Sequence, residues 1–113
     1  MNESILTTIK IMLGFPEDAE IPFTTEIVTN INSAFATLTH LGLGPTTGFS
    51  ISGPEQVWGD IIPENMNLEN VKQYIFLKTK VLFDPPASSG ALETMKEQIK
   101  ECEFRINIEV DER

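Results

Sequence analysis

The chain has only one cysteine and one histidine among its 113 residues, and this scarcity excludes several kinds of chemistry. Cys102 has no partner for an internal disulfide, and its position in an apolar stripe predicts a packed thiol rather than a nucleophile. His40 lies at the expected end of a helix, where a surface position is favoured. A zinc site would need several carboxylates in addition, so we expect no metal and no cofactor.

Catalytic motifs and membrane-spanning segments are also missing. The sequence contains no phosphate-binding loop, no dinucleotide-binding glycine motif, and no zinc-protease or serine-hydrolase motif, so we expect a protein that is not an enzyme. No apolar run approaches the roughly 18 residues of a membrane span. The first residues, MNESILTTIKIMLGF, are acidic at their start and precede no signal-cleavage site. These features predict a cytoplasmic protein that has no membrane partner.

Basic residues are scarce in the first part of the chain. Residues 1–70 contain nine acidic residues and one basic residue, which gives a net charge of −8. Residues 71–113 contain eight acidic and seven basic residues, which gives −1. Nucleic-acid binding requires a basic surface that neutralises phosphates, so specific DNA binding is disfavoured. The acidic excess serves either solubility or repulsion of DNA.

Apolar residues at helical spacing predict a mainly α-helical fold, a small bundle of about four helices that forms one domain over residues 1–113. Ser4 and Asn67 are suitable N-caps for the first and third helices, and Ser88 or Ser89 for the fourth. The predicted helices cover residues 4–13, 25–41, 67–83 and 88 onward. The third helix has apolar side chains on more than one side, which predicts that it is the central one.

A long loop rich in glycine and proline is predicted over residues 43–66. Five of the seven glycines lie in GLGPTTGFSISGPEQVWGD, and irregular segments of this length are usually binding loops or lids. A helical turn at Trp58 would return the tryptophan to the core. We treat Phe49, Ile51 and Trp58 as candidate contacts with a neighbouring subunit or partner, in a loop that becomes ordered on assembly.

Two periods overlap near the C-terminus, in CEFRINIEVD. Residues 102, 104, 106, 108 and 110 are apolar and alternate with polar residues, which is strand spacing superimposed on the end of the fourth helix. Either the helix continues, or residues 104–113 form an extended or β tail that adds to a sheet of another protein. In the second case the contacts with that partner would be made by Phe104, Ile106, Ile108 and Val110.

The segment LFDPPASSG at residues 82–90 admits two interpretations. Asp84 and Ser88 could be the acid and the hydroxyl nucleophile of a small enzyme. Alternatively, Pro85 and Pro86 end one helix and the serines begin the next, which makes a rigid corner between two helices. We favour the structural corner, because each of its residues has a role in ending or restarting a helix.

Several segments together resemble one protein family. IKIMLGF, INSAFATLTHLGLGPTTGFSI, VWGD, VKQYIFLKTKVLFDPP and EQIKECEFRIN follow one another in the order found in the small head-to-tail connector proteins of long-tailed double-stranded-DNA phages. These are also called head-completion or adaptor proteins. The resemblance covers about residues 4–107, and its most specific parts are LFDPP and the EQIKECEFR segment that starts at Glu97.

The resemblance implies a mostly α-helical subunit that assembles into a dodecameric ring beneath the portal protein, in the neck of the virion. Such a ring would extend the DNA channel, let genomic DNA pass without specific binding, and dock the tail or the next neck protein. It implies neither enzymatic activity nor a cofactor. The alternative is an acidic helical module that mimics DNA and inhibits a host protein, although the acidic residues here are scattered through turns.

Overall fold

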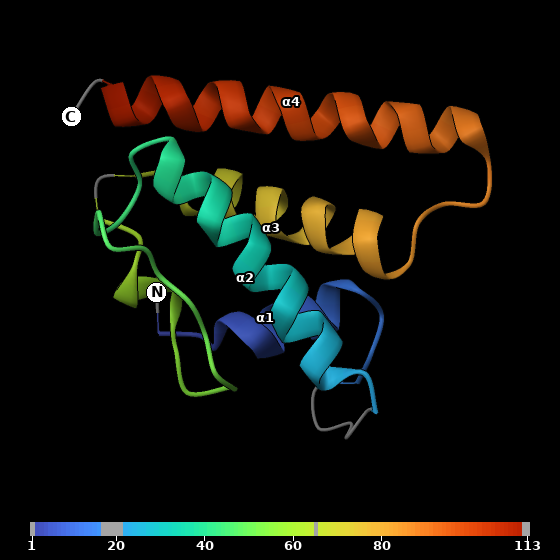
Figure 1. The fold of residues 1–113 in the computed structure, drawn as a ribbon, viewed down its shortest axis with the longest axis horizontal. Helices are drawn as coiled ribbons and strands as arrows, with labels where there is room; N and C mark the ends of the chain where they lie inside the picture. The colour runs from blue at the N-terminus through green and yellow to red at the C-terminus, as the bar shows by residue number, and fades with distance from the viewer. Residues whose placement is uncertain (1, 17–21, 65, 112–113) are drawn as a thin grey trace.

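The structure, a computed structural model, describes residues 2–16, 22–64 and 66–111. Within these ranges it contains four α-helices, one short 3-10 helix (η1) and no strand (Figure 1). The elements are α1 (Ile5–Met12), α2 (Thr24–His40), η1 (Trp58–Asp60), α3 (Leu68–Phe83) and α4 (Ser89–Asp111). The prediction of a mainly helical fold with about four helices is therefore confirmed.

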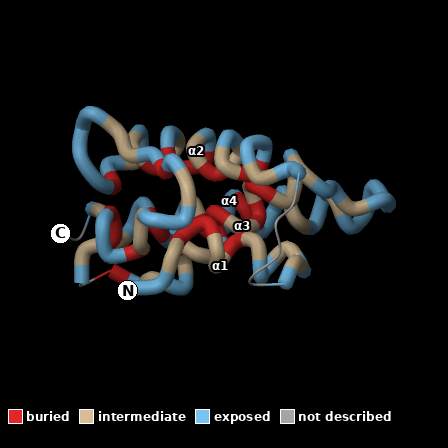
Figure 2. The backbone as a smooth tube through the Cα atoms, turned by 90° about the horizontal axis from the view of Figure 1, so that it is seen from below, coloured by how far each residue is buried: buried red, intermediate tan, exposed pale blue. Residues whose placement is uncertain are grey.

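Helix α3 is the central element and contacts α1, α2 and α4. It begins at the predicted cap, where the Asn67 side chain accepts hydrogen bonds from the backbone N–H groups of Glu69 and Asn70. Val71, Tyr74 and several other α3 side chains are buried between the neighbouring helices. The buried backbone accordingly runs through the middle of the molecule, with exposed segments around it (Figure 2).

Helix α1 holds the N-terminal part of the chain against the long loop between α2 and α3. Its N-cap is Ser4, whose hydroxyl accepts a hydrogen bond from Thr7 N at 3.2 Å. Trp58 in η1 is fully buried, and its indole N–H donates to Thr8 Oγ1 of α1 at 3.1 Å. The prediction that a helical turn returns the tryptophan to the core is confirmed.

A second attachment holds the loop on α2. The Asn32 side chain donates to the carbonyl oxygen of Ile51 at 3.0 Å and accepts from its N–H at 2.7 Å. Phe49 packs on Phe35 in an edge-to-face arrangement, with 5.1 Å between the ring centroids. One amide side chain thus satisfies both backbone groups of a loop residue that would otherwise need a strand partner.

Of the two alternatives for the C-terminal segment, the continued helix is the correct one up to Asp111, and the extended or β tail is wrong for residues 104–111; residues 112 and 113 lie outside the described residues. The alternating apolar positions 102, 106 and 110 are also four residues apart, so they lie on one face of a helix. Cys102 and Ile106 are buried on that face, whereas Phe104 and Ile108 point away from it and are exposed. Because α3 offers an apolar surface for the inner face, the helix buries more apolar area than a lone strand could.

The corner between α3 and α4 has the structure that its sequence predicts. Helix α3 ends at Phe83, Pro85 and Pro86 lie outside any helix, and α4 begins at Ser89. The Ser88 hydroxyl accepts a hydrogen bond from Ala91 N at 3.1 Å and so caps α4. Asp84 pairs with Lys80, one turn before it in the chain, at 3.2 Å and not with a base on another helix. The Asp84 carboxylate and the Ser88 hydroxyl thus each have a structural partner.

Candidate assembly surface

Helix α4 is attached to α3 along its C-terminal half. Ile99, Cys102 and Ile106 are buried against the core, and burial raises the pKa of the Cys102 thiol above its ordinary value. The Tyr74 hydroxyl donates to Glu103 Oε2 at 2.8 Å, and Glu109 Oε1 accepts from Asn67 N at 3.2 Å. These contacts fix the direction of α4 relative to the rest of the subunit.

Burial raises the pKa of Tyr74 above its ordinary value, and the hydrogen bond to the Glu103 carboxylate raises it further. Both effects favour the protonated phenol, which is the form that donates the hydrogen bond. The Tyr74 hydroxyl therefore remains a hydrogen-bond donor at neutral pH.

The outer face of α4 carries two large apolar side chains that nothing in the subunit covers. Phe104 is 65% exposed and Ile108 is 40% exposed. They lie four residues apart and therefore project side by side, one turn apart, on the face opposite the buried stripe. We call this pair the α4 ridge. Large apolar side chains that gather on an otherwise polar surface are typical of protein contacts.

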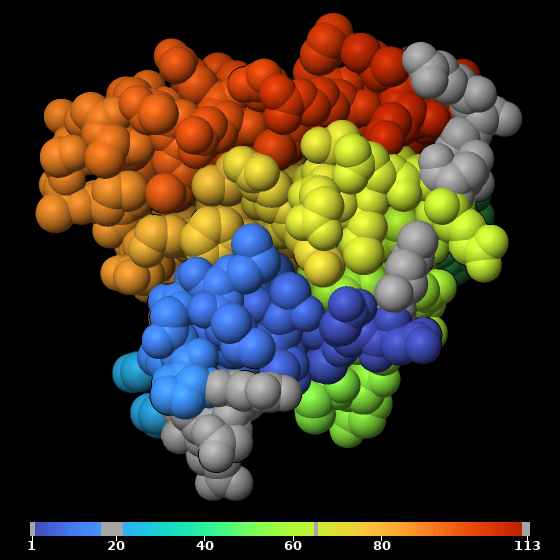
Figure 3. Space-filling view, turned by 180° about the vertical axis from the view of Figure 1, so that it is seen from behind, coloured from blue at the N-terminus to red at the C-terminus, as the bar shows by residue number. Residues whose placement is uncertain are grey.

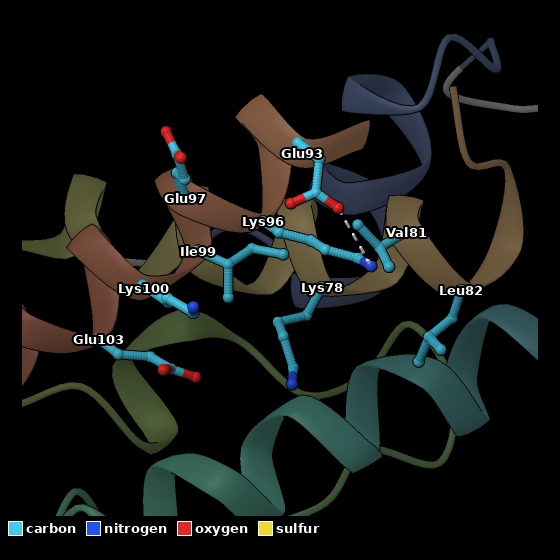
Figure 4. Close-up of a pocket in the computed structure, with 9 residues that line it drawn as sticks. All are labelled: Lys78, Val81, Leu82, Glu93, Lys96, Glu97, Ile99, Lys100 and Glu103. Carbon is cyan, nitrogen blue, oxygen red and sulfur yellow. Dashed lines mark ion pairs between the residues drawn. The ribbon is translucent and has the colours of Figure 1, made fainter. Parts of the chain in front are cut away.

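A groove separates the C-terminal half of α3 from the first half of α4 on one side of the molecule (Figure 4). It has a volume of about 390 Å³, and Val81, Leu82 and Ile99 supply its apolar surface. Three lysines and three glutamates complete the lining, and Glu93 pairs with Lys96 of the same helix at 3.9 Å. We call it the front groove. Its mixed charge leaves it neutral as a whole.

A second groove lies on the opposite side of α4, where α1, α3 and α4 meet (Figure 3). Its volume is about 370 Å³, and its apolar lining consists of Met12, Phe76, Leu77 and Met95. Lys72, Lys80, Glu69 and two glutamines complete the lining. We call it the back groove. The bases exceed the acids here, in contrast to the net charge of −9 of the chain.

The structure divides the candidate contact residues into two groups. Ile51, Trp58 and Ile106 are buried in the core of the subunit, and Phe49 and Val110 are half-buried against it. Only Phe104 and Ile108 are well exposed. A Cβ built at Gly42 would lie 3.0 Å from Val110 Cγ1, which shows how closely the end of α4 approaches the end of α2. The surface available to a partner on α4 is therefore the α4 ridge.

The sequence analysis included Phe104 and Ile108 among its candidate contacts, but as part of an extended tail together with Ile106 and Val110, and it missed both grooves. The back groove combines side chains from α1, α3 and α4 that lie far apart in the chain, such as Met12 and Met95. A periodic pattern within one helix carries no information about such a combination. The lysines of α3 were a weak signal, because most bases of the chain lie after residue 70.

A family model described as Phage connector protein matches residues 5–113. The chain belongs to this family. Neither the comparison with curated proteins nor the comparison with solved structures gave a match. The resemblance found in the sequence is thus confirmed at the level of the family. A connector joins parts of the virion, so the family supports a structural, non-enzymatic role in the phage neck, in contact with other virion components such as portal and tail proteins.

Within residues 2–16, 22–64 and 66–111, no helix combines the length and the apolar character that crossing a membrane requires. The same part of the chain has no group of three or more histidine, cysteine or carboxylate side chains that could hold a metal ion.

Proposed function

We propose that this connector forms a ring in the phage neck, between the portal protein and the tail, that extends the DNA channel and docks the tail or the next neck protein. The observation that carries the proposal is the exposed α4 ridge beside two grooves, in a chain of the connector family. A subunit with apolar surface on several sides is suited to contacts with more than one neighbour. Twelve subunits are the stoichiometry to test first.

The charge of the chain is consistent with passage of DNA through such a ring. The net charge of −9 would repel the phosphate backbone wherever acidic side chains line a channel. A channel that repels DNA lets the genome move in both directions, whereas a basic channel would retain it. Repulsion of this kind predicts that the free subunit binds double-stranded DNA no more tightly at low salt than at high salt.

A phage in which the gene carries an early stop codon tests the proposal directly. We expect heads that are filled with DNA and tails that are complete, but few joined particles in electron micrographs. Adding the purified connector to these heads should restore joining and should place a ring of density on the portal vertex. Heads without portal are the control and should gain no ring. If the stop codon left joining unchanged, the proposed role in the neck would be wrong.

A further inference from the structure

We propose that the front groove between α3 and α4 binds an acidic peptide segment of a neighbouring virion protein. A carboxylate of this segment lies between Lys78 and Lys100, and an apolar side chain next to it covers Leu82. The inference rests on the proposed function, because it names the chemistry of a partner that the connector contacts in the neck.

The front groove contains the two bases of α3 and α4 that have no carboxylate partner. These helices carry six bases, and four of them pair with an acid three or four residues away: Lys72 with Glu69, Lys80 with Asp84, Lys96 with Glu93, and Arg105 with Glu101. In the part of the chain that the structure describes, Lys78 and Lys100 have neither an ion pair nor a hydrogen-bond acceptor. Both of them line the front groove.

The two unpaired lysines reach the groove from opposite walls. Helices α3 and α4 run antiparallel (Figure 1), and the hydrogen bond from Tyr74 to Glu103 sets their register. Lys78 comes one turn after Tyr74, and Lys100 comes about one turn before Glu103, so the two lysines lie nearly level with each other. Figure 4 shows both side chains at the groove. An anion between two ammonium groups is favourable, because it pairs with both of them and offsets their mutual repulsion.

The acids of the front groove leave this pair of lysines only partly neutralised. Glu93 is already paired with another lysine of the groove. Glu97 is exposed, and its carboxylate points away from the two unpaired lysines in Figure 4. Glu103 is half-buried, and its Oε2 accepts the hydrogen bond from Tyr74 at 2.8 Å. The inner part of the groove therefore has an excess of positive charge, although the lining as a whole is neutral.

The apolar wall of the groove favours a peptide over other anions. Leu82 is 56% exposed, and Val81 and Ile99 lie beside it in the lining. An apolar side chain that packs on this wall would remove apolar area from water on both sides. The phosphates of DNA offer no such side chain, and the net charge of −9 opposes the approach of DNA. A segment that combines carboxylates with apolar side chains matches both the lysines and the wall.

The back groove does not have the same property. Its two lysines, Lys72 and Lys80, are paired with acids of their own segment, so their charges are already satisfied within the subunit. The front groove is thus the place on these two helices where an acidic partner gains ion pairs without breaking existing ones.

Titration of the purified connector with synthetic peptides tests the binding site. The probe is a short peptide with blocked ends in which leucines are flanked by glutamates, and the control peptide has glutamine in place of each glutamate. We expect the probe to shift the backbone amide signals of residues 78–82 and 96–103 in ¹⁵N NMR spectra, and high salt to weaken its binding. The glutamine peptide should bind at least about tenfold more weakly, as is typical of the loss of charge-assisted hydrogen bonds.

A matched pair of double variants assigns the binding to the two lysines. Lys78→Gln combined with Lys100→Gln removes both ammonium groups from the groove and should lower the affinity for the probe at least about tenfold. Lys72→Gln combined with Arg105→Gln removes the same charge from the same two helices outside the front groove, and should leave the affinity within about twofold. No shift of the groove signals, equal binding of the two peptides, or equal losses in the two variants would overturn the inference.

The same variants test the groove in particles. Added to heads that lack the connector, Lys78→Gln/Lys100→Gln should give at least about tenfold fewer joined particles than the control variant, as expected for loss of a central contact. If the two variants joined heads to tails equally well, the groove would have no part in assembly, while the role in the neck would stand. If the wild-type connector itself failed to restore joining, the proposed function would fail, whereas the titration would still report on the groove.

Two further measurements separate the acidic segment from other occupants of the groove. If the free wild-type chain formed multimers in native mass spectrometry that Lys78→Gln/Lys100→Gln did not form, the occupant would be a second copy of the chain. If a double-stranded oligonucleotide displaced the probe peptide, the groove would bind phosphate. Either result would overturn the inference, and we expect neither self-association through the groove nor displacement by DNA.

Discussion

Replacing Tyr74 with phenylalanine should lower the free energy of unfolding by about 1–2 kcal/mol. Tyr74 is fully buried, and its hydroxyl donates to the Glu103 carboxylate at 2.8 Å, from α3 to α4. The variant keeps the aromatic ring and its packing, so the loss is that of a single hydrogen bond to a charged acceptor, typically about 1.5–3 kcal/mol. The expected value lies toward the lower end because Glu103 is only half-buried, and water can replace part of the interaction.

Urea denaturation followed by circular dichroism at neutral pH measures this loss. For a domain of this size, the same change should lower the melting temperature by roughly 3–8 °C. Glu97→Gln, an exposed change on α4, is the control for loss of a carboxylate and should change the free energy of unfolding little. Coupling between Tyr74→Phe and Glu103→Gln in a double-mutant cycle should be near 1 kcal/mol. A loss for Tyr74→Phe no larger than that of the control would refute the hydrogen bond as a structural link.

Two further predictions concern the same pair of helices. Because burial and Glu103 raise the pKa of Tyr74 above its ordinary value of 10.0, the unfolded chain loses the phenolic proton first as the pH rises. Above pH 10 the difference in free energy of unfolding between the wild type and Tyr74→Phe should therefore shrink by about 1.4 kcal/mol per pH unit, until Tyr74 also ionises in the folded state. Urea titrations from pH 9 to 11 measure this difference, and a constant value would contradict the prediction. Ile106→Ala should lower the free energy of unfolding by about 2–5 kcal/mol, because the Ile106 side chain is fully buried. Asn107→Ala, on the exposed side of α4, is the control and should change thermal stability little. Equal effects of the two variants would show that the end of α4 is not packed.

The helices could be predicted from the sequence because their signals are local. Ser4 and Asn67 are caps within a few residues of the backbone groups that they satisfy. The corner at Pro85 and Pro86 is equally local, since proline restricts only itself and the residue before it. Apolar spacing then identified the inner face of each helix. The family could be recognised because these local features follow one another in a characteristic order.

The end of α4 could not be predicted from periodicity alone. An alternation of two also contains a spacing of four, so positions 102, 106 and 110 are compatible with either a strand or a helix. The choice depends on whether another element covers the inner face, and that element, α3, is supplied by the tertiary fold. The pairs Asn32–Ile51 and Tyr74–Glu103 were missed for the same reason, because they join residues 19 and 29 positions apart.

The α4 ridge and the back groove differ in their level along α4, and this offset restricts the architecture of any assembly built from them. Residues 95 and 98 precede residues 104 and 108 by about ten positions, or roughly 15 Å along the helix axis. If α4 stood parallel to the axis of symmetry, each added subunit would be displaced by that rise, and the product would be an open helical filament. A flat ring requires α4 to lie in the plane of the ring, perpendicular to the axis of symmetry. The tilt of a single helix thus separates a closed neck ring from an unlimited polymer.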